Sequence, residues 1–231
     1  MTRRPRPALQ SYHHGDLREG LVEAALAILG RGSVGALTLR AAAREAGVSP
    51  AAPYRHFADR DALIAAVAER GFATLFDRMR ASAAKAMASS PERGLQEIAV
   101  AYLRFALDRP AEYRVMFGPE LADRTRHRAL QETSTQVFGL LAEGIGGLQR
   151  AGRVRAGDVH AMALSAWALV HGLAMLALDG RAAEGDAAAL ERLGRTATEL
   201  LMFGMAAPAA SVPSPSKKPV RRPSRAPVAR R

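Results

Sequence analysis

The sequence contains no cysteine among its 231 residues. Without thiols the chain can form neither a disulfide framework nor a thiolate metal site, and it is compatible with a reducing compartment. Aromatic residues make up only 5% of the chain, with a single tryptophan, although 48% of the residues are hydrophobic. That apolar share is ample for a packed core, so a chain that is disordered throughout is excluded.

No stretch of the sequence alternates between polar and apolar residues as a half-buried strand does. Helical periodicity dominates, and proline and glycine separate the periodic runs. We therefore expect an all-α fold of about nine helices. The expected helices span approximately residues 15–30, 39–45, 50–57, 59–85, 91–108, 112–117, 121–151, 158–178 and 186–205.

The motifs of common catalytic sites are also missing from the sequence. It contains no glycine-rich phosphate loop, no Gly-x-Ser-x-Gly turn and no residues at metal-site spacing. His13, His14 and Asp16 lie close together, but a local histidine pair with one carboxylate falls short of a metal site. We expect no enzymatic activity, no metal and no cofactor.

The net charge of +11 is distributed unevenly along the chain. Residues 1–60 carry +4, residues 61–207 are neutral, and residues 208–231 carry +7. Basic ends around a neutral middle suit a protein whose centre packs on itself and whose ends meet phosphates. For the C-terminal end, a segment that only improves solubility is the alternative interpretation.

The segment 38–57 predicts two short helices joined by a tight turn. Thr38 can cap the first helix, 39–45, by accepting a hydrogen bond from a backbone N–H. Gly47 can end that helix, because a residue without a β-carbon enters the left-handed conformation cheaply. Ser49 can cap the second helix, and the proline that follows fits its first position. So short a connection is typical of a helix-turn-helix, which places its second helix in the major groove of DNA.

These residues carry a resemblance to a known family. Residues 37–67, LTLRAAAREAGVSPAAPYRHFADRDALIAAV, with the Tyr-x-His-Phe element at 54–57, resemble the DNA-binding domain of the TetR family of bacterial transcriptional regulators. The resemblance extends over residues 13–78. The segment WALVHG, residues 167–172, resembles the signature of the WHG type of C-terminal ligand-binding domain in that family.

Together, composition and resemblance predict four segments. These are a flexible basic arm (1–12), a helix-turn-helix DNA-binding domain (13–60), a helical ligand-binding and dimerisation domain (61–206) and a disordered Pro/Arg-rich tail (207–231). The tail contains no acidic and no aromatic residue, so it cannot bury enough surface to fold.

The resemblance implies a one-component transcriptional regulator, a repressor that a small-molecule effector in the C-terminal domain releases from its operator. A dimer would hold two recognition helices on a palindromic double-stranded DNA operator. The N-terminal residues carry charge but no apolar stretch of a secretory signal, so we expect a cytoplasmic protein. The alternative is a basic architectural DNA-binding protein with little sequence preference and no ligand.

The run 161–178 is apolar on nearly every face, so a transmembrane helix has to be considered. We reject it, because the run is marginal in length, rich in alanine and without a flanking Lys or Arg cluster. A helix without a polar face in a soluble protein is buried on all sides, which a second subunit can achieve. We expect a homodimer through the last two helices, about residues 158–178 and 186–205, with no membrane partner.

The resemblance implies DNA contact by residues around the helix-turn-helix. Tyr54 could instead pack by its ring, and His56 could be an ordinary surface histidine. Arg3, Arg4 and Arg6 could reach a minor groove. The residues expected at phosphates are Thr38, Tyr54, His56 and Arg60, and those expected at bases are Arg40, Ser49, Ala51, Ala52 and Arg55.

Aromatic and sulfur-containing side chains of the C-terminal domain could line an apolar cavity between helices. Ordinary core packing is the alternative for all of them. His171 lies one turn from Trp167 in an otherwise apolar helix, so its imidazole needs a polar partner, in the core or from a ligand. The candidate ligand-binding residues are Tyr102, Phe105, Tyr113, Phe117, Trp167, His171 and Met175.

Truncation after Ala206 tests the two interpretations of the basic tail. A sequence-specific regulator should keep its affinity for operator DNA and lose mainly its affinity for unrelated duplexes, because the tail contributes only non-specific phosphate contacts. Fluorescence anisotropy on both kinds of duplex measures the difference. Loss of nearly all affinity for both would favour the architectural protein.

Overall fold

The computed structural model describes residues 17–87, 90–121 and 123–206. This part of the chain contains eight α-helices and several short 3-10 helices, and no β-strand, so the prediction of an all-α fold is confirmed. The expected arm at residues 1–12, the possible metal ligands at 13–16 and the expected tail at 207–231 lie outside the described residues.

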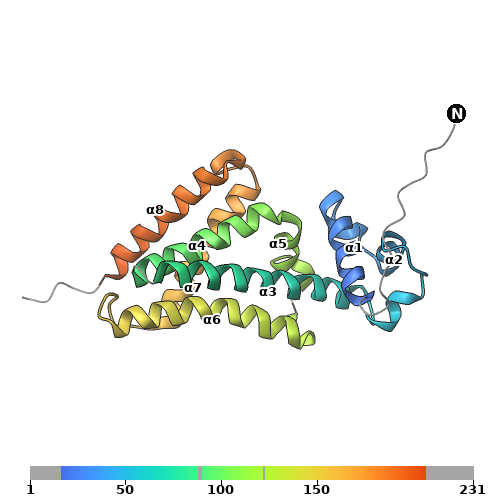
Figure 1. Ribbon diagram of the computed structural model, residues 1–231, viewed down its shortest axis with the longest axis horizontal. Coiled ribbons are helices and arrows are strands. Elements are labelled where there is room, and N and C mark those ends of the chain that lie inside the picture. Colours follow the sequence, from blue (N-terminus) through green and yellow to red (C-terminus); the bar gives the residue numbers. More distant parts are fainter. Residues whose placement is uncertain (1–16, 88–89, 122, 207–231) are drawn as a thin grey trace, which may run out of the picture.

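A small helical domain forms one end of the molecule (Figure 1). Leu21, Leu37, Phe57 and Leu63 are among the buried residues of its core. The long helix that follows begins in this domain and runs on into a larger helical bundle (Figure 1). The elements of the small domain are α1 (Leu17–Arg31), α2 (Leu39–Glu45) and a 3-10 helix (Ala52–Arg55), and the long helix is α3 (Arg60–Met87).

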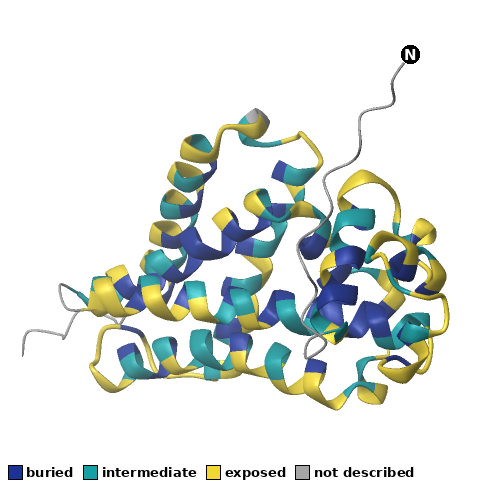
Figure 2. Ribbon diagram, turned by 45° about the vertical axis from the view of Figure 1, so that its right-hand side comes forward, coloured by how far each residue is buried: buried dark blue, intermediate teal, exposed yellow. Residues whose placement is uncertain are grey.

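The larger bundle is built around α3, which packs against three of its helices, α4, α5 and α6. The next layer is formed by α7, which packs on α4 and α6, and by α8, which packs on α4. Figure 2 shows the buried residues where helices face one another and the exposed ones along the outer sides. The bounds are α4 (Pro91–Asp108), α5 (Pro110–Met116), α6 (Arg128–Arg150), α7 (Val159–Leu178) and α8 (Ala187–Met205).

The local signals at the ends of α2 act as predicted. The hydroxyl of Thr38 accepts a hydrogen bond from the backbone N–H of Ala41 at 3.0 Å. Gly47 has φ of +72°, and the N–H of Val48 donates to the carbonyl of Ala43 at 3.0 Å. The chain therefore leaves α2 through a left-handed glycine, which a side chain at this position would strain.

The second helix of the unit differs from the prediction. It is a four-residue 3-10 helix from Ala52, not an α-helix capped by Ser49 and beginning at Pro50. Pro53 is the reason, because it has no N–H to bond back along an α-helix. It is buried instead, and its carbonyl accepts hydrogen bonds from the N–H groups of the two residues after Arg55, both at 2.9 Å.

The start of α6 also differs from the prediction. It begins at Arg128, not near residue 121, and short 3-10 helices cover residues 119–121 and 124–126. The side chain of Asp123 accepts a hydrogen bond from the N–H of Thr125 at 3.1 Å. Such a local turn competes with helix formation, and it places Arg124 outside any long helix.

Candidate functional site

The residues expected to contact DNA lie on the surface of the small domain. Tyr54 is 55% exposed, so the alternative that its ring packs in the core is wrong. Ala52 is half-buried, and α2 packs against the 3-10 helix that contains it. The exposed residues of this set, which we call the DNA face, are Thr38, Arg40, Ser49, Ala51, Tyr54, Arg55 and His56.

Arg60 differs from the other residues expected at phosphates. Its Nε donates to the carbonyl of Leu37 at 2.8 Å, and its Nη2 donates to the carbonyl of Val34 at 2.7 Å. The guanidinium therefore ties the start of α3 to the chain just before Thr38. Two of its three nitrogens donate to backbone oxygens, so Arg60 helps to position the DNA face, and its contact with phosphate stays a prediction.

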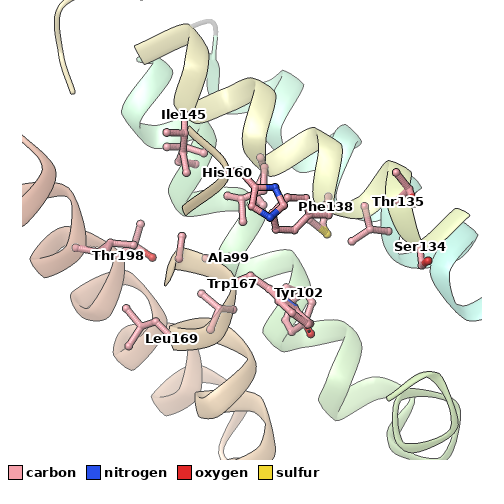
Figure 3. A pocket seen from close by; sticks show the side chains of 18 of the residues that line it. Ala99, Tyr102, Ser134, Thr135, Phe138, Ile145, His160, Trp167, Leu169 and Thr198 are labelled. Atoms are coloured by element: carbon pink, nitrogen blue, oxygen red, sulfur yellow. Dashed lines mark hydrogen bonds between the residues drawn. The ribbon is translucent and has the colours of Figure 1, made fainter. Parts of the chain in front are cut away.

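A cavity of about 390 Å³ lies within the helical bundle, a size typical of small-molecule sites. Its wall is formed by side chains from α3, α4, α6, α7 and α8 and from the segment between α5 and α6. Most of these side chains are apolar. Figure 3 shows Phe138 and Trp167 from different helices beside the same space, with Ser134 and Thr135 toward one end and Thr198 toward the other.

The structure divides the expected ligand-binding residues into two groups. Tyr102, Phe117 and Trp167 line the cavity, as expected. The other four, Phe105, Tyr113, His171 and Met175, are not among the lining residues. Phe105 is fully buried in the core, and Met175 packs against the core from its position on α7. Their helices turn these side chains away from the cavity.

Tyr113 and His171 lie one side chain behind the cavity wall. The Tyr102 hydroxyl accepts a hydrogen bond from Trp167 Nε1 at 3.2 Å and lies 3.1 Å from the Tyr113 hydroxyl. His171 Nδ1 lies 2.9 Å from the Tyr102 oxygen and 2.8 Å from the Tyr113 oxygen. The imidazole thus has polar partners within the protein, as expected if its partner comes from the core and not from a ligand.

Burial keeps this hydrogen-bonded cluster uncharged. It lowers the pKa of His171 below its ordinary value, so the imidazole is neutral near pH 7. It raises the pKa of Tyr102 to about 12 and raises that of Tyr113 as well, so both phenols keep their protons. The cluster therefore offers hydrogen bonds, not charge, to the cavity.

Several lining residues were not expected from the sequence. Phe72 and Met79 lie on one side of α3, two turns apart, and Thr198, Met202 and Met205 recur with helical spacing on α8. Helical periodicity indicates that such residues face inward, but it does not distinguish residues that line a cavity from residues that pack in the core. Arg124 gave no sequence signal at all, because it lies in the irregular segment before α6.

An ionic cluster around one buried carboxylate joins the small domain to the bundle. The side chain of Glu112 on α5 is buried, and its Oε2 lies 3.0 Å from Nη1 of Arg109. Arg70 on α3 lies 3.7 Å from Oε1 of the same carboxylate. Nη1 of Arg70 also donates to Glu19 and Glu23 on α1, at 2.6 Å each. One guanidinium thus connects α1, α3 and α5.

The helix α5 connects this ionic cluster to the cavity. At Gly71 it lies so close to α3 that a β-carbon would come within 2.5 Å of the Met116 sulfur. Met116 ends α5, and its carbonyl accepts a hydrogen bond from Arg124 Nη2 at 2.6 Å. The next residue, Phe117, lines the cavity. The two sites are therefore attached to opposite ends of one short, closely packed helix.

The outer faces of α7 and α8 expose large apolar side chains. By length and composition α7 is the one helix of the described chain that could cross a membrane, yet it packs within the bundle on α4 and α6. Only 28% of its apolar window is buried in a single chain. The exposed side chains, which we call the apolar face, are Leu164, Leu169, Leu176, Leu193, Leu200 and Phe203.

Two family descriptions match the chain. "Bacterial regulatory proteins, tetR family" matches residues 21–67, and "Tetracyclin repressor-like, C-terminal domain" matches residues 95–214. The first match covers the helix-turn-helix, and the second covers most of α4 and all of α5 to α8, which include most of the cavity wall. No curated protein matches the chain.

Solved structures similar to this chain match most of its length. A protein with unknown function from Rhodococcus sp. RHA1 is 35% identical, with a TM-score of 0.75, over 86% of this chain and 100% of that one. The fatty acid degradation regulator FadR from Bacillus halodurans is 14% identical, with a TM-score of 0.67, over 84% and 98%. A TetR family transcription regulator from Marinobacter aquaeolei VT8 is 16% identical, with a TM-score of 0.61, over 83% and 96%. The last two similarities are of fold alone.

Replacing Arg70 by Met should destabilise the protein by about 3 kcal/mol, because it leaves the buried Glu112 carboxylate with one cation fewer. The matched control is Arg80→Met on the same helix, where an exposed pair with Asp77 at 3.6 Å is lost. That change should cost less than about 1 kcal/mol. Urea unfolding followed by circular dichroism measures both, and equal losses would contradict a structural role of the cluster.

Proposed function

The chain belongs to the TetR family of bacterial transcriptional regulators, and on that premise we propose how it works. It is a DNA-binding transcriptional regulator of the ligand-responsive repressor type. In our proposal a homodimer binds a palindromic operator through two DNA faces, and an effector in the cavity releases it. The observation that carries this proposal is the cavity joined to the small domain through α5.

At the DNA face, we assign phosphate contacts to Thr38, Tyr54 and His56, and base contacts to Arg40, Ser49, Ala51, Ala52 and Arg55. Pro50, Ala51 and Ala52 offer apolar contacts to thymine methyl groups but no bidentate hydrogen bonds, and Pro53 is buried. Recognition of bases therefore depends on Arg40, Arg55 and the shape of the DNA.

The effector acts through α5 in this proposal. A ligand that contacts Phe117 or Arg124 favours one position of α5, because both residues adjoin its C-terminal end. The buried Glu112 and its partner Arg70 transmit that position to α1. A ligand can shift the equilibrium between two arrangements only by as much as its affinity for them differs. The same coupling requires DNA to weaken ligand binding equally.

The dimer in this proposal forms through the apolar face. Two copies of α7 and α8 would bury this surface as a four-helix interface and hold the two DNA faces at a fixed separation. An exposed apolar patch of this extent marks an interaction surface in proteins of this kind. Residues 13–60 and 61–206 then serve as the DNA-binding domain and the ligand-binding and dimerisation domain, and α3 starts at their boundary. We propose the cytoplasm as the place of action.

Replacing Arg40 by Ala should weaken binding to the operator by about 1–3 kcal/mol and relax its base preference, because a base contact is lost. Tyr54→Ala should instead weaken binding about equally on all duplexes. Arg80→Ala, an exposed arginine of the bundle, is the control and should change nothing. Footprinting of DNA beside the gene defines the operator, and fluorescence anisotropy gives the affinities. Unchanged affinity in both variants would contradict the assigned DNA face.

The protein should form a dimer of twice the chain mass of 24.6 kDa without DNA or ligand. Leu200→Asp should give monomers, because it buries an unpaired charge in the interface. Met87→Asp changes a comparably exposed residue outside the apolar face and should leave the dimer intact. Size-exclusion chromatography with light scattering measures the mass. A monodisperse wild-type monomer at micromolar concentration would contradict this interface.

A further inference from the structure

Arg124 gives the cavity a charge that nothing in the described chain balances. It is the one arginine among the described residues that line the cavity, and no lysine, aspartate or glutamate of the described chain lines it. The described part of the chain offers it no ion-pair partner, whereas Arg70 shares three carboxylates. Burial alone lowers the pKa of Arg124, and no carboxylate offsets this effect. A half-buried cation without a counter-ion is unfavourable until an anion reaches it.

The guanidinium of Arg124 is also held in place. Its Nη2 donates to the carbonyl of Met116 at 2.6 Å, and its central carbon lies 5.2 Å above the ring of Phe72. The ring and the carbonyl both favour the charged form and restrict the orientation of the side chain. The remaining N–H groups can still form the planar fork that suits a carboxylate. The head-group site is thus organised before any ligand arrives.

Much of the rest of the cavity wall suits an apolar body. Leu95, Ile98, Val137, Leu141 and Ile145 come from α4 and α6 and carry no polar side-chain atom. Figure 3 shows Ile145 and Leu169 well away from the hydroxyl-bearing end of α6 at Ser134 and Thr135. A ligand that fills this space therefore has to combine one anionic group with a substantial hydrocarbon part.

We propose that the effector is an amphipathic carboxylate whose head group pairs with Arg124 and whose hydrocarbon body fills the apolar part of the cavity. This inference rests on the proposed function, which requires an effector but does not give its chemistry. One negative charge neutralises the guanidinium, whereas a doubly charged phosphate would leave an excess charge in an apolar space. A neutral ligand would leave Arg124 without a partner.

The position of Arg124 also connects the head group with release from DNA. The same guanidinium that would receive the carboxylate donates to the last residue of α5. An anion that draws Arg124 toward itself therefore also changes the hydrogen bond to the Met116 carbonyl. The head group, more than the hydrocarbon body, acts on the helix that leads to Glu112 and α1.

Trp167 makes the inference testable with the full-length protein. It is the only tryptophan of the chain and lines the cavity, so its fluorescence reports occupancy directly. The probes are dodecanoate, dodecanol and dodecyl phosphate, which share one hydrocarbon chain and differ in the head group. We expect dodecanoate to bind the wild-type protein at least about ten-fold more tightly than either other probe, as expected of a desolvated charge pair.

The variants locate the preference at one residue. Arg124→Gln should reduce dodecanoate affinity about ten-fold and leave the acid and the alcohol nearly equal, whereas Arg124→Lys should retain part of the preference. Arg126→Gln, an exposed arginine of the same 3-10 helix that does not line the cavity, is the matched control and should behave as wild type. Circular dichroism verifies that the variants are folded.

Two outcomes of the binding measurements would overturn the inference. One is equal or stronger binding of dodecanol or dodecyl phosphate to the wild-type protein, a comparison that needs no variant. The other is an unchanged acid preference in folded Arg124→Gln. Operator binding measured in parallel separates this failure from that of the proposed function. If only a neutral ligand releases the protein from operator DNA, the carboxylate is refuted and the proposed function stands. If dodecanoate binds in an Arg124-dependent way but the protein binds no operator, the proposed function is refuted and the carboxylate stands.

Discussion

The arrangement of the whole molecule depends on one buried carboxylate. Glu112 has no access to water, so its charge is tolerated only while Arg109 and Arg70 stay beside it. Arg70 is held in turn by Glu19 and Glu23 on α1. A shift of α5 that separated these groups would leave an unpaired charge in the interior. The ion pairs therefore connect the small domain with the cavity wall, and they are either formed or broken rather than gradually weakened.

Because α5 is short, these ion pairs lie close to the cavity wall. The helix extends only from Pro110 to Met116, with the ionic cluster near its beginning and the cavity wall at its end. The close contact at Gly71 leaves little room for adjustment against α3. Closely packed elements exchange between discrete positions rather than deforming continuously. Occupancy of the cavity can thus favour one whole arrangement of the small domain over another.

The sequence best predicted the features that depend on residues close to one another in the chain. The cap at Thr38, the glycine at Gly47 and the bounds of most helices follow from contacts within a few residues, and the structure confirms them. The shortened second helix was mispredicted because Pro53 combines a missing N–H with burial, and only the missing N–H is visible in the sequence. The late start of α6 depends on a local turn at Asp123 that competes with a good helical pattern.

The candidate site was predicted by residue type but not by direction. Aromatic residues of the bundle were expected to line a cavity, but a small rotation of a helix decides whether a ring faces the cavity, as at Tyr102, or the core, as at Phe105. The pairing of Glu112 with Arg70 joins residues far apart in the chain. That Arg124 has no ion-pair partner in the described chain depends on all the residues that surround it in the fold. No local pattern contains either kind of information.

The cluster behind Tyr102 holds three polar groups whose hydrogen bonds depend on one proton of His171. If neutral His171 carries its proton on Nε2, Nδ1 accepts, and both phenol protons find an acceptor within the cluster. If the proton sits on Nδ1, the imidazole donates to a tyrosine oxygen, and one of the two phenol protons has no acceptor left among the three groups. The tautomer of a single ring therefore decides whether the cluster is complete by itself or needs an acceptor from outside.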